Sequence, residues 1–250
     1  MRRIMLTLDY IGSAYCGWQR QPGLDTVQSR VEEALKKLTG ESITVTASGR
    51  TDAGVHALSQ VIHFDTNSNI PVKNFMTGTN HFLPADIRVL KAKEVSPDFH
   101  ARFDAIEKTY CYAMYESEVD KSAYFGRAVR IKGKLDVIKM REASKALEGE
   151  HDFTSFMSTG ADTNTAVRTI KSIRVVRRDG LVKIYATANG FLYNMVRLIA
   201  GVLVRAGKGE IDREGVQRLL ELKSKDAVRE VMPADGLYLK SVKYPSRRQK

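Results

Sequence analysis

SITVTASGRTDAGVHALSQVIHFDT, residues 42–66, contains two runs of strand-forming residues joined by a short polar loop. The runs 42–48 and 60–66 are rich in Val, Ile, Thr and Phe, which favours two strands. The loop between them holds two glycines, which permit tight backbone turns, and Asp52, with Arg50 two residues earlier. The stretch therefore predicts two consecutive strands that hold a charged loop at one end.

The elements around this stretch complete a β-α-β-β-α-β order. Apolar and polar residues alternate over 3–10, which predicts a strand. A helix is predicted to begin after Asp25-Thr26 and to end at Gly40, because these are typical capping residues. A second helix over 71–82 and a strand over 86–95 follow. This is the order of a ferredoxin-like half.

The second half of the chain repeats that order. The pattern predicts a hairpin of strands around Asp179-Gly180, a dipeptide typical of tight β-turns. The other expected elements are strands at 108–115, 169–178, 181–188 and 236–244, and helices at 136–147, 193–206 and after Asp212. Residues 117–134 fit as a less regular insertion.

The fold class is therefore predicted to be α+β. Two ferredoxin-like halves are expected to form a mixed, mainly antiparallel sheet with the helices packed on one face. The predicted domains are 1–104, an N-terminal half that carries the Asp52 loop, and 105–250, a C-terminal half that carries Tyr110 and Arg197.

Charge is the informative part of the composition. The chain has 250 residues and a formal net charge of +11, with a pI near 9.6. Such an excess favours polyanionic partners, either nucleic acid or an anionic membrane surface. Because no apolar run approaches the roughly 20 residues that span a bilayer, we expect no membrane protein. With two cysteines and no signal-peptide pattern, a cytoplasmic protein without a disulfide framework is expected.

Several common site chemistries are not supported. The five histidines show no spacing typical of metal ligands, so no metal is expected. The stretch 201–209, GVLVRAGKG, departs from a phosphate-binding loop in its spacing and ends in Gly209 where Ser or Thr is required. We therefore expect no metal and no nucleotide-binding loop.

Three residues remain as candidates for chemistry, and each also has an ordinary structural reading. Asp52 is either a turn former or a reactive carboxylate on a stiff loop. Arg197 lies in an otherwise apolar helix, so it either extends to the rim or pairs with a carboxylate. Tyr110 is either a half-buried strand residue or a group that faces a ligand.

These residues lie in segments that resemble the TruA family of tRNA pseudouridine synthases. The resemblance runs nearly end to end, and GRTDAGVHALSQVIHF (49–64) is similar to the catalytic motif of the family. Other similar segments include DYIGSAYCGWQRQP, FHARFDAIEKTYCY, GEHDFTSF, VRTIKSI, NGFLYNMVR and GLYLKSVKYP. Residues 117–134, TGTNHFLPADI and REVMPADGL depart from the usual family pattern.

The resemblance implies a pseudouridine synthase fold and the isomerisation of uridine to pseudouridine at positions 38, 39 and 40 of the tRNA anticodon stem-loop. It implies an isomerase without cofactor, a homodimer, and tRNA as the partner. Asp52 stands at the catalytic aspartate, Tyr110 at the active-site tyrosine and Arg197 at the arginine that pairs with the aspartate. Arg50 stands at the arginine that helps to extrude the target nucleotide.

These residue types suit the reaction. The N1–C1′ bond must break and a C5–C1′ bond must form, which calls for an ionised carboxylate beside the nucleotide. Asp52 could attack C1′, add to C6, or first remove the 2′ proton, and the sequence leaves all three open. A non-catalytic RNA-binding module and a related enzyme with another RNA target are the competing hypotheses.

Overall fold

A computed structural model describes residues 1–160, 163 and 165–245 of the chain. The chain divides into two compact units, which are described separately. The first unit contains residues 1–106 together with the C-terminal segment from Tyr238, and the second contains residues 107–237. The boundary at residue 106 lies close to the expected one at 104. The segment from Tyr238, expected with the C-terminal half, packs with the first unit.

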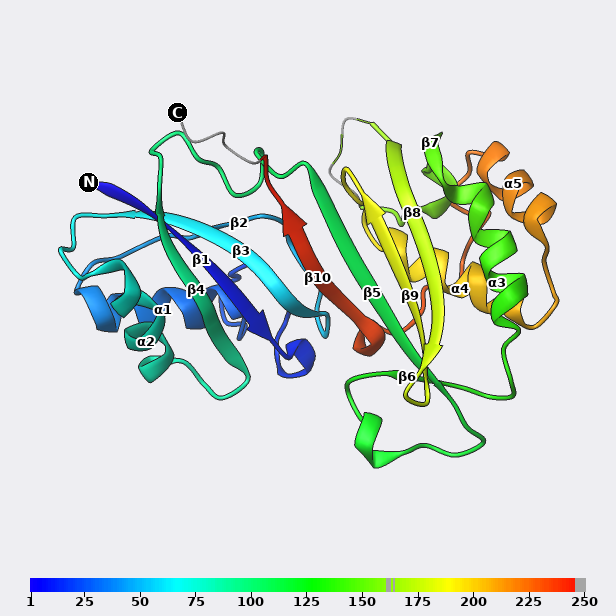
Figure 1. Cartoon of the computed structure of the whole chain (residues 1–250), viewed down its shortest axis with the longest axis horizontal. Helices are drawn as coiled ribbons and strands as arrows, with labels where there is room; N and C mark the ends of the chain where they lie inside the picture. Colours follow the sequence, from blue (N-terminus) through cyan, green and yellow to red (C-terminus); the bar gives the residue numbers. More distant parts are fainter. Residues whose placement is uncertain (161–162, 164, 246–250) are drawn as a thin grey trace. The chain divides into compact units, whose positions relative to one another are not determined.

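The first unit is a ferredoxin-like β-α-β-β-α-β unit with one added strand. Its strands lie in the order β4-β1-β3, and β2 and β10 both pair with the other edge of β3. All these pairs are antiparallel except β3 with β10. Helices α1 and α2 lie behind the strands in Figure 1. The elements are β1 (Arg2–Tyr10), α1 (Val27–Thr39), β2 (Thr46–Ala47), β3 (His56–Thr66), α2 (Val72–Phe82), β4 (Ile87–Val95) and β10 (Leu237–Lys243).

Helix α1 begins and ends where its sequence predicts. The Thr26 hydroxyl accepts the backbone N–H of Ser29, and the Ser29 hydroxyl accepts the N–H of Thr26, which makes a reciprocal cap. Gly40 ends the helix with φ +76°, a left-handed conformation that glycine adopts without strain. The buried face, including Val31 and Leu35, packs into the core.

The strand expected over 42–48 is much shorter, and α1 explains why. The Glu32 carboxylate accepts the backbone N–H of Val45 at 3.1 Å, and the Gln28 amide donates to the Val45 carbonyl at 3.4 Å. Both side chains are buried. Because these side chains satisfy the backbone of Val45, it needs no strand partner, and β2 is confined to Thr46–Ala47.

The second unit has a sheet in the order β5-β9-β8-β7, all antiparallel, with β6 parallel to β5. The β8–β9 turn is confirmed at Asp179 and Gly180, whose φ angles are +53° and +73°. Figure 1 shows α4 behind β8 and β9. The elements are β5 (Glu107–Glu116), β6 (Val129–Ile131), α3 (Val137–Ser144), β7 (Gly149–Asp152), β8 (Val167–Arg178), β9 (Leu181–Ala188), α4 (Met195–Gly207) and α5 (Arg213–Glu221).

Two short strands and one helix end differ from expectation. The helix expected over 136–147 is α-helical only to Ser144 and continues as a 3-10 turn. Strand β7 begins at Gly149 and is absent from the elements expected from the sequence. Strand β6 lies within the irregular segment 117–134. Each of these strands has only three or four residues and exists through pairing with a longer neighbour. No helix in the described part of the chain is both long and apolar enough to cross a membrane.

Candidate active site

Asp52 lies on the loop between β2 and β3, in the first unit. Its side chain is half-buried, whereas that of Arg50 on the same loop is exposed. The backbone N–H of Val55 donates to the Asp52 carbonyl at 3.1 Å, which closes a tight turn. Gly54 within the turn has φ +79°, a conformation that favours glycine. The structure thus shows Asp52 at the start of a turn.

Buried hydrogen bonds fix both ends of this loop. On one side, the Ser48 hydroxyl donates to Gln60 at 2.6 Å, and the Gln60 amide donates to the Gly49 carbonyl at 2.8 Å. On the other side, the hydroxyls of Tyr10 and Thr51 are 2.8 Å apart. Burial raises the pKa of Tyr10 to about 12, so this hydroxyl keeps its proton. Asp52 is therefore adjacent to an anchored backbone.

A second loop, which contains Gly17 and Trp18, packs against the Asp52 loop. The backbone N–H of Trp18 donates to the Thr51 carbonyl at 2.9 Å. Gly17 has φ +86°, and a Cβ there would lie 2.8 Å from the same carbonyl oxygen. Only glycine allows so close an approach of the two backbones. The N–H of Gly12 also donates to Nδ1 of His56 at 2.9 Å, just after the loop. Together these contacts hold the backbone of Asp52 in one geometry.

Tyr110 is a buried residue of β5, in the second unit. It pairs with Ala186 of β9, and its ring meets the Phe191 ring edge-on at a centroid distance of 5.1 Å. Phe191 lies in the loop that leads into α4. The burial of Tyr110 exceeds the half-buried state that its strand pattern suggests.

Arg197 lies in the first turn of α4, as expected, among buried apolar residues. Its side chain is half-buried, and two acceptors hold it. Nε donates to the Met232 carbonyl at 2.5 Å, and Nη1 donates to Oδ1 of Asn194 at 2.8 Å. Asn194 is itself fixed by a 3.0 Å bond to the Ser158 hydroxyl. The guanidinium is therefore positioned by its own unit.

The structure groups the predicted residues by unit. Asp52 and Arg50 share one loop of the first unit, and Tyr110 and Arg197 both belong to the second. The expected pairing of Asp52 with Arg197 would join the two units and stays a prediction.

The residues that support the Asp52 loop were not singled out from the sequence. Tyr10, Gly17, His56 and Gln60 lie before or after the loop, and their contacts form only when the chain folds. The available signal was their position: Tyr10 and Gly17 lie in the segment similar to the family opening, and His56 and Gln60 lie in the segment similar to the catalytic motif.

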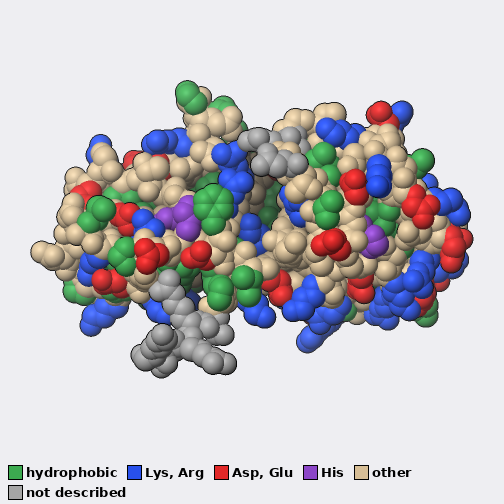
Figure 2. All heavy atoms as spheres, turned by 90° about the horizontal axis from the view of Figure 1, so that it is seen from above, with side chains coloured by type: hydrophobic (Ala, Val, Ile, Leu, Met, Phe, Trp, Pro, Cys, Tyr) green, Lys and Arg blue, Asp and Glu red, His purple; other side chains and the backbone are tan. Residues whose placement is uncertain are grey.

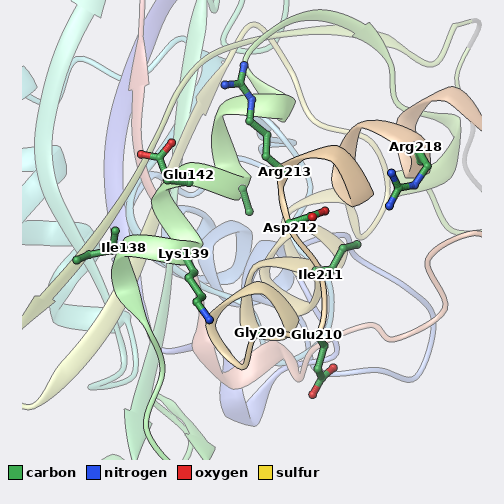
Figure 3. Close-up of a pocket in the computed structure, with 10 residues that line it drawn as sticks. Ile138, Lys139, Glu142, Gly209, Glu210, Ile211, Asp212, Arg213 and Arg218 are labelled. Atoms are coloured by element: carbon green, nitrogen blue, oxygen red, sulfur yellow. The ribbon is translucent and has the colours of Figure 1, made fainter.

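A cavity of about 450 Å³ lies elsewhere in the second unit, between α3 and the α4–α5 connection (Figure 3). Lys139, Arg213 and Arg218 line it together with three carboxylates. One of these, Asp212, caps α5 by accepting the N–H of Gly215 at 2.8 Å. The charges balance, so the cavity offers no clear preference for an anion. Within the described residues, no three His, Cys, Asp or Glu side chains gather as a metal site would require.

The surface fits a partner with many negative charges. Figure 2 shows Lys and Arg side chains at many places on one face, interspersed with acidic ones. This agrees with the net charge of +11.

Comparison with known proteins assigns the family. The sequence model of the tRNA pseudouridine synthase family matches residues 7–104 and 143–245. A Clostridium perfringens relative named tRNA pseudouridine synthase A 2 is 43% identical over 244 residues, which cover 98% of this chain and 100% of the relative. A Blochmanniella pennsylvanica relative named tRNA pseudouridine synthase A is 43% identical over 246 residues, 98% of this chain and 94% of the relative. The solved archaeal box H/ACA sRNP Nop10-Cbf5 complex aligns with a TM-score of 0.36 and 13% identity, over 92% of this chain and 60% of that one, which is too low to bear on the assignment. On the sequence matches, this chain belongs to the family of tRNA pseudouridine synthases.

Proposed function

We propose that this protein isomerises uridine to pseudouridine at positions 38, 39 and 40 in the anticodon stem-loop of tRNAs. The observation that carries the proposal is the anchored Asp52 loop, which occurs in the segment similar to the catalytic motif of the family. A catalytic carboxylate must be held within a fraction of an ångström of its productive position. Two loops and a buried hydrogen-bond network serve that purpose here.

The reaction rearranges the substrate without adding or removing atoms. The N1–C1′ bond breaks, the uracil turns, and C5 bonds to C1′; the C5 proton is lost and N1 gains one. Asp52 acts as the nucleophile, and because an ionised carboxylate is disfavoured by burial, it requires a counter-charge. Arg197 supplies that charge and is already oriented by Met232 and Asn194.

The remaining residues act on the target nucleotide. A base within a stem cannot reach a catalytic carboxylate, so it must leave the stack. Arg50 is exposed and assists this extrusion. Tyr110 stacks on the uracil, and its hydroxyl carries the C5 proton away. We infer a cytoplasmic homodimer that needs no cofactor and takes tRNA as its partner.

Mapping of pseudouridine at single-nucleotide resolution, after incubation with unmodified tRNA, tests the function. Wild-type protein is expected to modify positions 38–40. Asp52→Asn is expected to abolish turnover and to leave tRNA affinity equal or higher, because it removes a negative charge from an RNA-facing loop. Asp98→Asn, at an exposed acidic residue, is the matched control and should retain wild-type turnover.

Three outcomes would contradict the proposal. Activity of Asp52→Asn within about tenfold of wild type would exclude the nucleophile role. Modification at other sites only would favour a related enzyme with a different RNA target. Tight tRNA binding without any pseudouridine would favour a non-catalytic RNA-binding module.

A further inference from the structure

Two segments of the second unit carry a concentration of positive charge. Residues 117–134, here named the basic arm, contain five Lys or Arg and two Asp or Glu. Residues 174–183, the tip of the β8–β9 hairpin, contain four Lys or Arg and one Asp. These 28 residues account for six of the eleven net positive charges of the chain. More than half of the net charge is therefore carried by these two segments.

The basic arm is anchored to the sheet. Its strand β6 pairs with the end of β5, where Arg130 lies opposite Tyr115. The rings of Tyr115 and Tyr124 pack at 4.6 Å, and the backbone N–H of Lys121 donates to the Tyr115 hydroxyl at 3.2 Å. The arm thus presents a defined surface.

The acidic side chains of the basic arm form their contacts within the arm. Arg130 binds the Asp120 carboxylate at 2.8 Å and the Glu118 carbonyl at 2.7 Å. The Glu118 carboxylate accepts the N–H of Gly133 at 3.3 Å. Arg130 is thereby paired inside the arm, and three further basic residues have exposed side chains: Lys121, Lys132 and Lys134.

An aromatic side chain projects from the same arm. Phe125 is 89% exposed although the neighbouring Tyr124 packs inward. Burial of a phenylalanine ring stabilises a folded protein, so this exposure forgoes a stabilising contact. An exposed ring among cations is typical of surfaces that contact bases and ribose in RNA.

The hairpin tip lies beside the arm. A Cβ added at Gly180 would lie 3.4 Å from the Tyr124 hydroxyl. Arg177 of the tip also bonds to the two residues that flank the arm, because it donates to the Glu116 carboxylate and to the Leu135 carbonyl, both at 2.7 Å. Arg178 is 83% exposed on its side chain. The arm and the hairpin tip therefore lie side by side, with exposed cations on both segments and the exposed Phe125 next to Tyr124 in the arm.

We propose that this surface binds a helical stem of the substrate tRNA outside the anticodon stem-loop, with the exposed cations on phosphates and Phe125 against ribose or an unpaired base beside that stem. The position follows from β5, which runs from Tyr110 to the base of the arm at Tyr115, a span of about 17 Å at 3.3–3.4 Å per residue. If Tyr110 lies at the reacting uridine, as in the proposed function on which this inference rests, the arm reaches RNA well away from it. Two protein copies would bring like charges together here, so RNA is favoured over self-association.

The experiment compares full-length unmodified tRNA with an isolated anticodon stem-loop oligonucleotide. Phe125→Ala should weaken binding of the full-length tRNA about fivefold or more, the loss expected for one aromatic contact. The double variant Lys121→Gln/Arg178→Gln should reduce the log–log salt slope for full-length tRNA by about two. Affinity for the isolated stem-loop, and turnover on it, should stay at the wild-type level.

Ile138→Ala and Lys225→Gln are matched controls, since both residues are exposed in the second unit outside the arm and the tip. Equal losses on both RNAs, or no loss on either, would overturn the proposal. A change from dimer to monomer in Phe125→Ala, measured by light scattering, would instead identify a self-interface and also overturn it. Binding is measured without turnover, so a chain that lacked synthase activity would still report on the arm.

Discussion

Arg197 is held by two acceptors of its own unit, and the proposed function gives it a chemical role as well. Its Nε and Nη1 donate hydrogen bonds to two different acceptors of the second unit. A lysine ammonium cannot reproduce the geometry of these two bonds. We expect Arg197→Lys to lower turnover by about a hundredfold, in line with losses of preorganised electrostatic groups. Arg197→Met should lose more, because the unpaired Asp52 would take up a proton more readily.

The pH profile separates the two roles of Arg197. If Arg197→Met acts through the charge of Asp52, part of its activity should return as pH rises and the carboxyl ionises again. Thermal unfolding of both variants measures separately how far each substitution lowers the stability of the protein. A profile of Arg197→Met parallel to that of wild type would show that the arginine acts through packing alone.

His63 couples stability to pH. Burial, with smaller contributions from Arg3 and His100, lowers its pKa to about 4. Its Nδ1 accepts the backbone N–H of Ala101 at 3.1 Å, a bond that protonation removes. Since the unfolded value is about 6.5, the stabilisation is complete above that pH and declines as pH falls toward 4.

His63→Asn provides the test, because the Asn oxygen can accept the same bond without titrating. Between about pH 7 and pH 4.5, the Tm of wild type should fall more steeply than that of the variant. Carboxylates titrate in both proteins, so their contributions to the pH dependence of Tm cancel in the comparison. Parallel Tm curves would mean that His63 takes up no proton on unfolding.

At the scale of elements, the two loops around Asp52 depend on each other. Gly17→Ala would combine a positive φ with a contact of 2.8 Å to the Thr51 carbonyl. Gly23→Ala shares the positive φ (+73°) but has no atom within 4 Å of its Cβ, which makes it a matched control. Gly23→Ala should cost about 1 kcal/mol of stability and leave turnover intact.

Gly17→Ala should cost more, about 2–4 kcal/mol, and should also lower turnover because the Asp52 loop must shift. Chemical denaturation and single-turnover assays measure the two effects. Equal effects of the two substitutions would show that the close approach of the loops does not position Asp52.

Elements with strong local signals could be predicted from the sequence. The caps of α1 and the Asp179-Gly180 turn are examples, because neighbouring residues determine them. The short β2 could not be predicted, since Glu32 of α1 takes the backbone partner that a strand would supply. Strand β7 likewise exists because it pairs with β8. The sequence identified Asp52 but not Tyr10 or Gln60, whose bonds form only in the folded unit.

At the scale of the whole molecule, charge governs the encounter with RNA. A net charge of +11 attracts a polyanion over distances that exceed any single contact, and salt screens this attraction. Each neutralised phosphate releases condensed counterions, which makes log Kd depend linearly on log salt concentration.

We therefore expect steep salt dependence of tRNA binding. If about five phosphates are contacted, the log–log slope has a magnitude of about four, and affinity falls several-hundredfold between 50 and 200 mM salt. Binding of unmodified tRNA by wild type and Asp52→Asn over that range measures it. The two slopes should agree, because in the proposed function Asp52 acts on the nucleotide and not on a phosphate. Affinity that is independent of salt would argue against tRNA as the partner, whatever the chemistry at Asp52.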